Sequence, residues 1–173
     1  VRAQYELGRI YRDGRDVEKD ALLAVAWLTR AAEQDSDAAA YALGVLLLTG
    51  GEGLAKDVSA AVSWLRRSAE GGNQYAQYQL SRLLLQGEEV PREIEEAVRW
   101  LTVSAEQGNQ YAQYALGKLY LIGKEVPRDP KAAVRWFTLS AAQGNEYAQY
   151  VLDHMDNGPS ILSCATRLLH HLS

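Results

Sequence analysis

The chain has 173 residues, of which 47% are hydrophobic and 23% are charged, and only four are prolines. This composition is typical of an ordered globular domain and excludes a disordered segment. The formal net charge is −4 at neutral pH, which disfavours nucleic-acid binding because domains that bind DNA or RNA usually have a basic excess.

The sequence also predicts neither a membrane protein nor a disulfide-stabilised one. No apolar run approaches the ~18 residues that a transmembrane helix needs. Cys164 is the only cysteine, so an internal disulfide is excluded. The chain begins at Val1, inside a repeat and without a signal-peptide pattern. We therefore expect a fragment of a longer protein, and its start does not indicate a compartment. The location expected for the protein is cytoplasmic.

Two aromatic series show that most of the chain is an internal repeat. The tryptophans stand 37, 36 and 36 residues apart, and one series of tyrosines has a similar spacing. The two series are Trp27, Trp64, Trp100 and Trp136, and Tyr5, Tyr41, Tyr78, Tyr114 and Tyr150. A period between about 20 and 50 residues indicates a repeat architecture with one continuous core. We predict a single repeat domain over 1–173.

Each repeat is expected to form a pair of α-helices, here called helix A and helix B. In repeat 109–144, apolar and small residues recur every three or four positions in two segments, which indicates two amphipathic helices. In chain order the predicted repeats are 1–36, 37–72, 73–108 and 109–144, followed by a fifth helix A at 145–157 and a cap helix at 159–172. A terminal element of this kind is expected to cover the last open face of the stack.

Residues between the helices predict where each helix starts and ends. Asp20, Asp57 and Asp129 are placed to cap helix B, and Glu93 stands at the same position. Helix B is expected to end at a left-handed residue, which is glycine at 72, 108 and 144 and Asp35 in the first repeat. Glycines 8, 44 and 117 fall inside helix A, where glycine costs about 1 kcal/mol relative to alanine. Close approach of helix B, whose tryptophan is expected to cover the pair, explains this cost.

These residues together resemble the Sel-one-like repeat, a relative of the tetratricopeptide repeat. In repeat 109–144 the resemblance is carried by Ala112, Leu116, Gly117, Tyr120, Gly123, Val126, Asp129, Ala133, Trp136, Ala141 and Gly144. The resemblance implies an all-α fold, a right-handed α-solenoid. It also implies a non-catalytic adaptor for protein complexes, found in bacteria and eukaryotes, and we expect a bacterial source here. The segment from Asp153 to Ser173 resembles, more loosely, the repeat tails of mobilisation relaxases of Gram-positive bacteria.

The resemblance also implies that helix A lines a concave groove, which here is rich in tyrosine. The expected partner-binding residues are Tyr75, Tyr78, Arg82, Tyr111, Tyr114, Lys118, Tyr147 and Tyr150. Tyrosine is enriched at interfaces because it combines a large contact area with a polar tip. With the neighbouring cations, the groove suits a peptide that has apolar and acidic side chains. The series from Tyr5 to Tyr150 is equally expected if each ring packs on a neighbouring helix, which leaves both readings open.

Other motifs give no catalytic, cofactor or metal site. The turn Gly50–Gly53 resembles a phosphate-binding loop, but no strand precedes it and no Lys-Ser/Thr pair follows. His154, Asp156, His170 and His171 lack the spacing of a helical zinc site. Cys164 is expected to be a small buried hydrophobic residue. The sequence therefore predicts a protein-interaction scaffold with a protein or peptide partner. An accessory module of a relaxase and a structural spacer remain as alternatives.

Overall fold

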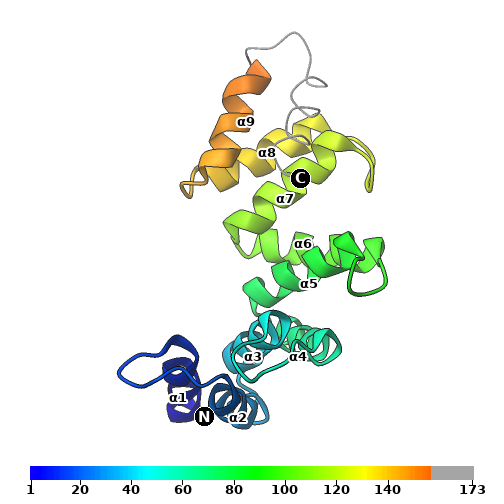
Figure 1. Cartoon of the computed structure of the whole chain (residues 1–173). Helices are drawn as coiled ribbons and strands as arrows, with labels where there is room; N and C mark the ends of the chain where they lie inside the picture. Colours follow the sequence, from blue (N-terminus) through cyan, green and yellow to red (C-terminus); the bar gives the residue numbers. More distant parts are fainter. Residues whose placement is uncertain (157–173) are drawn as a thin grey trace. The chain divides into compact units, whose positions relative to one another are not determined.

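The computed structural model describes residues 1–156, which form nine α-helices joined by short loops (Figure 1). This part of the chain contains no strand, apart from an isolated bridge between Gly51 and Leu54. The fold is therefore all-α, as the sequence predicts. The helices are α1 (Arg2–Asp13), α2 (Ala21–Ala32), α3 (Asp37–Thr49), α4 (Val58–Glu70), α5 (Gln74–Gln86), α6 (Ile94–Glu106), α7 (Gln110–Ile122), α8 (Pro130–Ala141) and α9 (Glu146–Asp156).

Odd-numbered helices correspond to helix A and even-numbered helices to helix B. The most extensive contacts join α1 to α2, α3 to α4 and α7 to α8, and smaller ones join α2 to α3, α4 to α5 and α8 to α9. The first, second and fourth repeats are thus helix pairs, and each of them also contacts the helix that follows it. The helices group into two compact units, Val1–Trp100 and Leu101–Ser173. We call them the first unit and the second unit and describe each by itself.

Polar caps define the start of helix B as the sequence predicts. The carboxylate of Asp20 accepts a hydrogen bond from the Leu23 amide at 2.8 Å, and Asp57 accepts one from Ala60 at 2.9 Å. Asp129 accepts one from Ala132 at 3.0 Å, and Pro130 occupies the first turn, where its missing N–H is not needed. These bonds satisfy amide groups that have no partner inside the helix.

Left-handed residues follow the ends of helix B, and this prediction is confirmed for Asp35. Its φ is 61°, and the glycines at the same repeat position, Gly72, Gly108 and Gly144, have φ values of 97°, 96° and 88°. Aspartate tolerates this conformation at a higher cost than glycine. Its carboxylate also forms an ion pair with Arg67, 2.8 Å between Oδ1 and Nη2. The corner therefore has a contact that glycine does not provide.

Three glycines inside helix A lie against helix B, which confirms the predicted close approach. A Cβ atom added to Gly8 would lie 2.6 Å from Leu28 Cγ. One added to Gly44 would lie 2.8 Å from Leu65 Cγ, and one added to Gly117 would lie 2.8 Å from Phe137 Cε1. The tryptophan of helix B was predicted to cover the helix pair, but it is not the residue that lies against the glycine of helix A. The covering residue is the next one along helix B, which is fully buried. The tryptophan is half-buried, because adjacent residues on a helix point about 100° apart.

Buried polar side chains hold helices together within and between repeats. In the first unit, Ser68 of α4 donates to the carbonyl of Asp37 of α3 at 2.7 Å. Gln77 of α5 donates to the carbonyl of Ala69 near the end of α4 at 3.1 Å. Ser140 and Gln113 make the equivalent bonds in the second unit, at 2.7 and 3.1 Å. Because all four side chains are buried, these bonds also satisfy groups that would otherwise be costly to bury.

The predicted cap helix at 159–172 lies outside the described residues. Cys164, His170 and His171 belong to the same segment, as does most of the tail that resembles relaxase repeats. The predicted fifth helix A is present as α9.

Candidate protein-interaction surface

Tyrosines of helix A gather in one cluster in each unit. The first tyrosine cluster lies on α1, α3 and α5 and consists of Tyr5, Arg9, Arg12, Tyr41, Tyr75, Tyr78 and Arg82. The second tyrosine cluster lies on α7 and α9 and consists of Tyr111, Tyr114, Lys118, Tyr147, Tyr150 and His154. Within one helix these residues are three, four or seven positions apart, so they share one face.

The first turn of helix A places one tyrosine at an exposed position. Asn73 caps α5 and Asn109 caps α7. Each side-chain oxygen accepts hydrogen bonds from the backbone amides two and three positions later, and the first of these donors are Tyr75 N and Tyr111 N, both at 3.0 Å. The tyrosine side chains then point outward, with exposed fractions of 50% for Tyr75, 52% for Tyr111 and 69% for Tyr147. Tyrosine is enriched at protein interfaces relative to the rest of the protein surface.

In the first cluster, Tyr41 lies between aromatic and basic neighbours. Its ring centroid is 6.1 Å from that of Tyr75, with an interplanar angle of 35°. Burial raises the pKa of Tyr41, and the nearby Tyr75 hydroxyl acts in the same direction while Arg12 opposes it. Arg12 also donates to Asp13 at 2.7 Å, and this bond lowers the pKa of the Asp13 carboxyl. The Tyr75 ring is therefore in contact with the partly buried Tyr41 ring.

A cation lies over a tyrosine ring four residues earlier in three of the helices A. Arg9 lies 5.7 Å from the centroid of Tyr5, Arg82 lies 5.8 Å from Tyr78, and Lys118 lies 5.8 Å from Tyr114. In α9, His154 occupies the same position and stacks on Tyr150 with centroids 4.0 Å apart. Such contacts contribute about 0.5–1 kcal/mol at exposed sites.

In the second cluster, Tyr114 is the central ring. It contacts Phe137 of α8 at a centroid distance of 5.7 Å and Tyr147 of α9 at 6.2 Å. The Lys118 side chain is half-buried beside it, and this burial lowers the pKa of the Lys118 ammonium. The cluster therefore joins aromatic surface to a partly desolvated cation.

The periodic tyrosines differ in burial. Tyr5, Tyr41, Tyr78 and Tyr114 are half-buried, and the contacts of Tyr41 and Tyr114 with neighbouring helices agree with packing inside the repeat stack. Tyr150 stands at the same repeat position but is 54% exposed. Position in the repeat therefore does not by itself decide exposure. The most exposed tyrosines are Tyr75 in the first cluster and Tyr111, Tyr147 and Tyr150 in the second.

Sequence reasoning overlooked a second set of cations, which lies over the tryptophans of helix B. An arginine stands 4.8–5.7 Å from the ring centroid of each tryptophan. The pairs are Arg30 with Trp27, Arg67 with Trp64, Arg99 with Trp100, and Arg135 with Trp136. The signal in the sequence is an arginine three residues after or one residue before each tryptophan. Because the tryptophans are half-buried, these pairs stabilise the surface of helix B.

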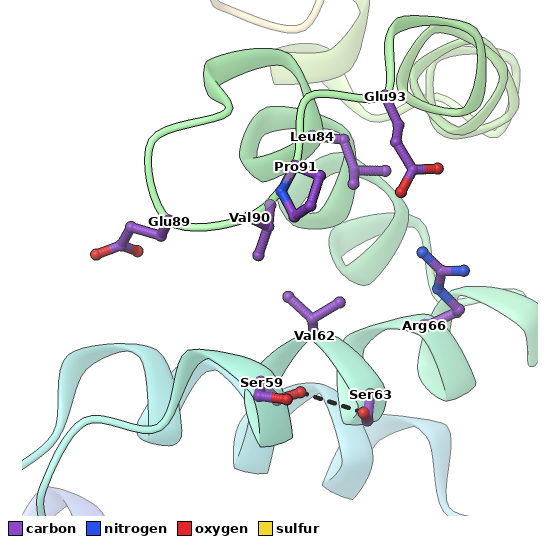
Figure 2. A pocket seen from close by; sticks show the side chains of 9 residues that line it. All are labelled: Ser59, Val62, Ser63, Arg66, Leu84, Glu89, Val90, Pro91 and Glu93. Atoms are coloured by element: carbon purple, nitrogen blue, oxygen red, sulfur yellow. Dashed lines mark hydrogen bonds between the residues drawn. The ribbon is translucent and has the colours of Figure 1, made fainter.

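A cavity of about 340 Å³ lies in the first unit between α4 and the loop that joins α5 to α6. Figure 2 shows Val62 of α4 facing Val90 and Pro91 of the loop, with Arg66 and Glu93 at one end. Ser59 and Ser63 line the α4 side. The first, third and fourth repeats have longer side chains at the Ser59 position, namely Leu22, Glu95 and Lys131. Small residues on α4 therefore open this gap.

Three sequence-based expectations about other sites concern the described residues. Gly50–Gly53 form a turn in which Gly51 and Leu54 exchange backbone hydrogen bonds of 3.0 Å, as a lengthened connection requires. Within residues 1–156 no group of three or more His, Cys, Asp or Glu side chains is arranged to hold a metal ion. None of the helices in this part is long and apolar enough to cross a membrane.

Comparison with known proteins identifies the repeat. The family model described as the Sel1 repeat matches residues 1–36, 37–73, 74–109 and 110–145, close to the predicted repeat boundaries. No curated protein is significantly similar to the chain.

Solved structures show the same architecture. A Sel1 repeat protein from Oxalobacter formigenes is 33% identical, with a TM-score of 0.78, over 86% of this chain and 59% of that one. A protective antigen of uropathogenic Escherichia coli strains, with an SLR fold, is 35% identical, with a TM-score of 0.82, over 90% of this chain and 34% of that one. The chain thus spans 59% and 34% of the lengths of these two proteins. Helicobacter pylori cysteine rich protein B shares the fold. It is 20% identical, with a TM-score of 0.61, over 77% of this chain and 95% of that one.

Proposed function

Because the chain belongs to the Sel1 repeat family, we propose that it is a non-catalytic scaffold that binds a peptide or a partner protein through its tyrosine clusters. Sel1 repeat proteins are generally protein–protein interaction scaffolds. Stacked helix pairs suit this role because they present extended surfaces without forming a closed cavity. We further propose that, within each unit, the tyrosine cluster lies on the concave side expected for helix A.

The observation that supports this proposal best is the exposure of the first-turn tyrosines. Tyr75, Tyr111 and Tyr147 recur at 36-residue intervals and are 50%, 52% and 69% exposed. The tyrosines one turn later are more buried in α5 and α7, so the first-turn rings are not needed to fill the core. A large aromatic side chain that repeats at an exposed position suits contact with a partner.

The arrangement also limits the entropic cost of binding. Tyr75 rests against Tyr41, and Tyr147 rests against Tyr114. A ring held in place before binding loses little rotamer freedom when a partner covers it. Truncating such an aromatic residue at the centre of an interface typically costs ~2 kcal/mol or more.

The test is the triple variant Tyr75→Ala, Tyr111→Ala, Tyr147→Ala. Surface substitutions usually change stability by less than ~0.5 kcal/mol, so we expect a thermal melt close to that of the wild type. Wild type and variant then serve as paired baits in a lysate of the source organism, with captured proteins quantified by mass spectrometry. A partner lost by the variant is purified, and its affinity is measured with both baits. We expect a loss of about tenfold or more.

A matched control removes exposed apolar side chains that lie on helix B. Leu22, Val134 and Leu139 are 56%, 40% and 41% exposed, and their replacement by alanine should leave partner affinity unchanged. A collapsed melt of the tyrosine variant would assign these rings to the core. An intact melt with unchanged affinity for every partner would reject the tyrosine clusters as the binding site. A wild-type bait that captures no specific partner would favour a structural spacer.

A further inference from the structure

Lys118 differs from the other cations of the tyrosine clusters in the contacts that it makes within residues 1–156. Within the described residues it forms neither a hydrogen bond nor an ion pair, and its contact is with the Tyr114 ring at 5.8 Å. The side chain is half-buried. A cation that has lost water without gaining an anion is in an unfavourable state that an anionic ligand would improve.

The same repeat position in other repeats shows how this state arises. Arg9 pairs with Glu6 three residues earlier, 3.4 Å between Nη1 and Oε2. Arg82 donates to Gln79, also three residues earlier, at 3.2 Å. The corresponding neighbour of Lys118 is Ala115, which offers no acceptor. The local sequence thus provides a carboxylate, an amide and finally a methyl group beside these three cations.

The surroundings of Lys118 favour an anion that is attached to apolar groups. Tyr114 contacts Tyr147 at a centroid distance of 6.2 Å, and Tyr147 is 69% exposed. Partial burial lowers the pKa of the Lys118 ammonium because the charged form is less well solvated there. Charges interact more strongly in such an environment than in open water. An anion beside Lys118 would also bring its neighbouring groups onto the exposed Tyr147 ring.

We propose that Lys118, together with the rings of Tyr114 and Tyr147, forms a subsite for one carboxylate side chain of an acidic, partly apolar partner segment. This inference rests on the proposed function and specifies the chemistry of the partner. A carboxylate fits better than a phosphate, because phosphate is usually held by arginine or by several donors, whereas Lys118 acts alone here. The apolar residue beside the carboxylate contacts Tyr147.

The test uses the full chain and labelled synthetic peptides. In one short peptide glutamate alternates with leucine, in a second glutamine replaces every glutamate, and in a third phosphoserine replaces every glutamate. Fluorescence anisotropy measures each affinity. We expect the glutamate peptide to bind about tenfold more tightly than its glutamine twin, as one charge-assisted contact allows. Carbodiimide coupling of the bound glutamate peptide should form an amide at Lys118, identified by mass spectrometry.

Variants assign the effect to this lysine. Lys118→Met should remove most of the preference for glutamate, and Lys118→Arg should retain it. The control is Lys131→Met, which makes the same charge change at an exposed lysine of α8 and should change nothing. A thermal melt of each variant verifies the fold.

The outcomes distinguish this inference from the proposed function. If glutamate and glutamine peptides bind equally and Tyr147→Ala weakens both, the tyrosine cluster binds peptides but the carboxylate subsite is refuted. Preferred binding of the phosphoserine peptide at Lys118 would also refute the carboxylate assignment. If the wild type binds none of the peptides, the subsite is rejected, while the proposed function is still judged by its own paired-bait experiment.

Discussion

The substitution Gly117→Ala tests whether close helix contact explains the glycines inside helix A. On an isolated helix, alanine would be favoured over glycine by about 1 kcal/mol. Here the new Cβ would lie 2.8 Å from Cε1, 2.9 Å from Cδ1 and 3.1 Å from Cζ of Phe137. Carbon atoms in favourable contact are about 3.5–4.0 Å apart, so the methyl group would overlap one edge of the ring.

The ring has little freedom to move away. Phe137 is fully buried and contacts Tyr114 at 5.7 Å. Overpacking of this kind typically costs about 1–3 kcal/mol, which exceeds the gain in helix propensity. We expect a net loss of about 1 kcal/mol in the free energy of unfolding, measured by urea denaturation followed by circular dichroism.

The control exploits the one described repeat in which a Cβ already occupies this position. Ser81 is fully buried there, and its hydroxyl donates to the Tyr78 carbonyl at 2.7 Å. Ser81→Gly should therefore also destabilise, by about 1 kcal/mol, through lost helix propensity together with the lost hydrogen bond. Adding a side chain at Gly117 and removing one at Ser81 are thus both expected to destabilise the fold. A Gly117→Ala protein as stable as the wild type, or more stable, would contradict the close-approach explanation.

Two further predictions concern hydrogen bonds. Ser140→Ala removes the buried bond to the Gln110 carbonyl and should lower the free energy of unfolding by about 1 kcal/mol, whereas Ser63→Ala, at an exposed position, should change it by less than ~0.5 kcal/mol in the same urea experiment. Asp13→Asn removes the carboxylate that accepts from Arg12. Because this bond lowers the folded-state pKa of Asp13, the carboxylate stabilises the fold above its unfolded-state pKa, and this contribution is lost as pH falls through the folded-state pKa. The stability difference between wild type and Asp13→Asn should therefore be largest at neutral pH and should disappear in acid. It stays below ~1 kcal/mol because the pair is partly exposed. A stability difference that grows in acid would contradict the assignment.

The sequence by itself predicted the helices, because their signals are local. The spacing of apolar residues, the capping aspartates and the left-handed residues after helix B all act within a few positions of the chain. Asp35 is an example, because the repeat pattern alone predicted a left-handed aspartate where the other repeats have glycine. Its φ of 61° confirms that prediction. The mid-helix glycines likewise predicted a close contact before any partner helix was known.

Only the tertiary structure decided which residue makes each contact and which tyrosine is exposed. The repeat did not show that Phe137, not Trp136, meets Gly117, because that depends on the rotation of one helix against another. Tyr114 and Tyr150 share a repeat position, yet Tyr114 lies between Phe137 and Tyr147 while Tyr150 is 54% exposed. Exposure depends on neighbouring helices, and an ion pair such as that of Arg67 with Asp35 depends on a side chain about 30 residues away. The periodic positions carry similar residues in each repeat, but the neighbouring side chains differ from one repeat to the next.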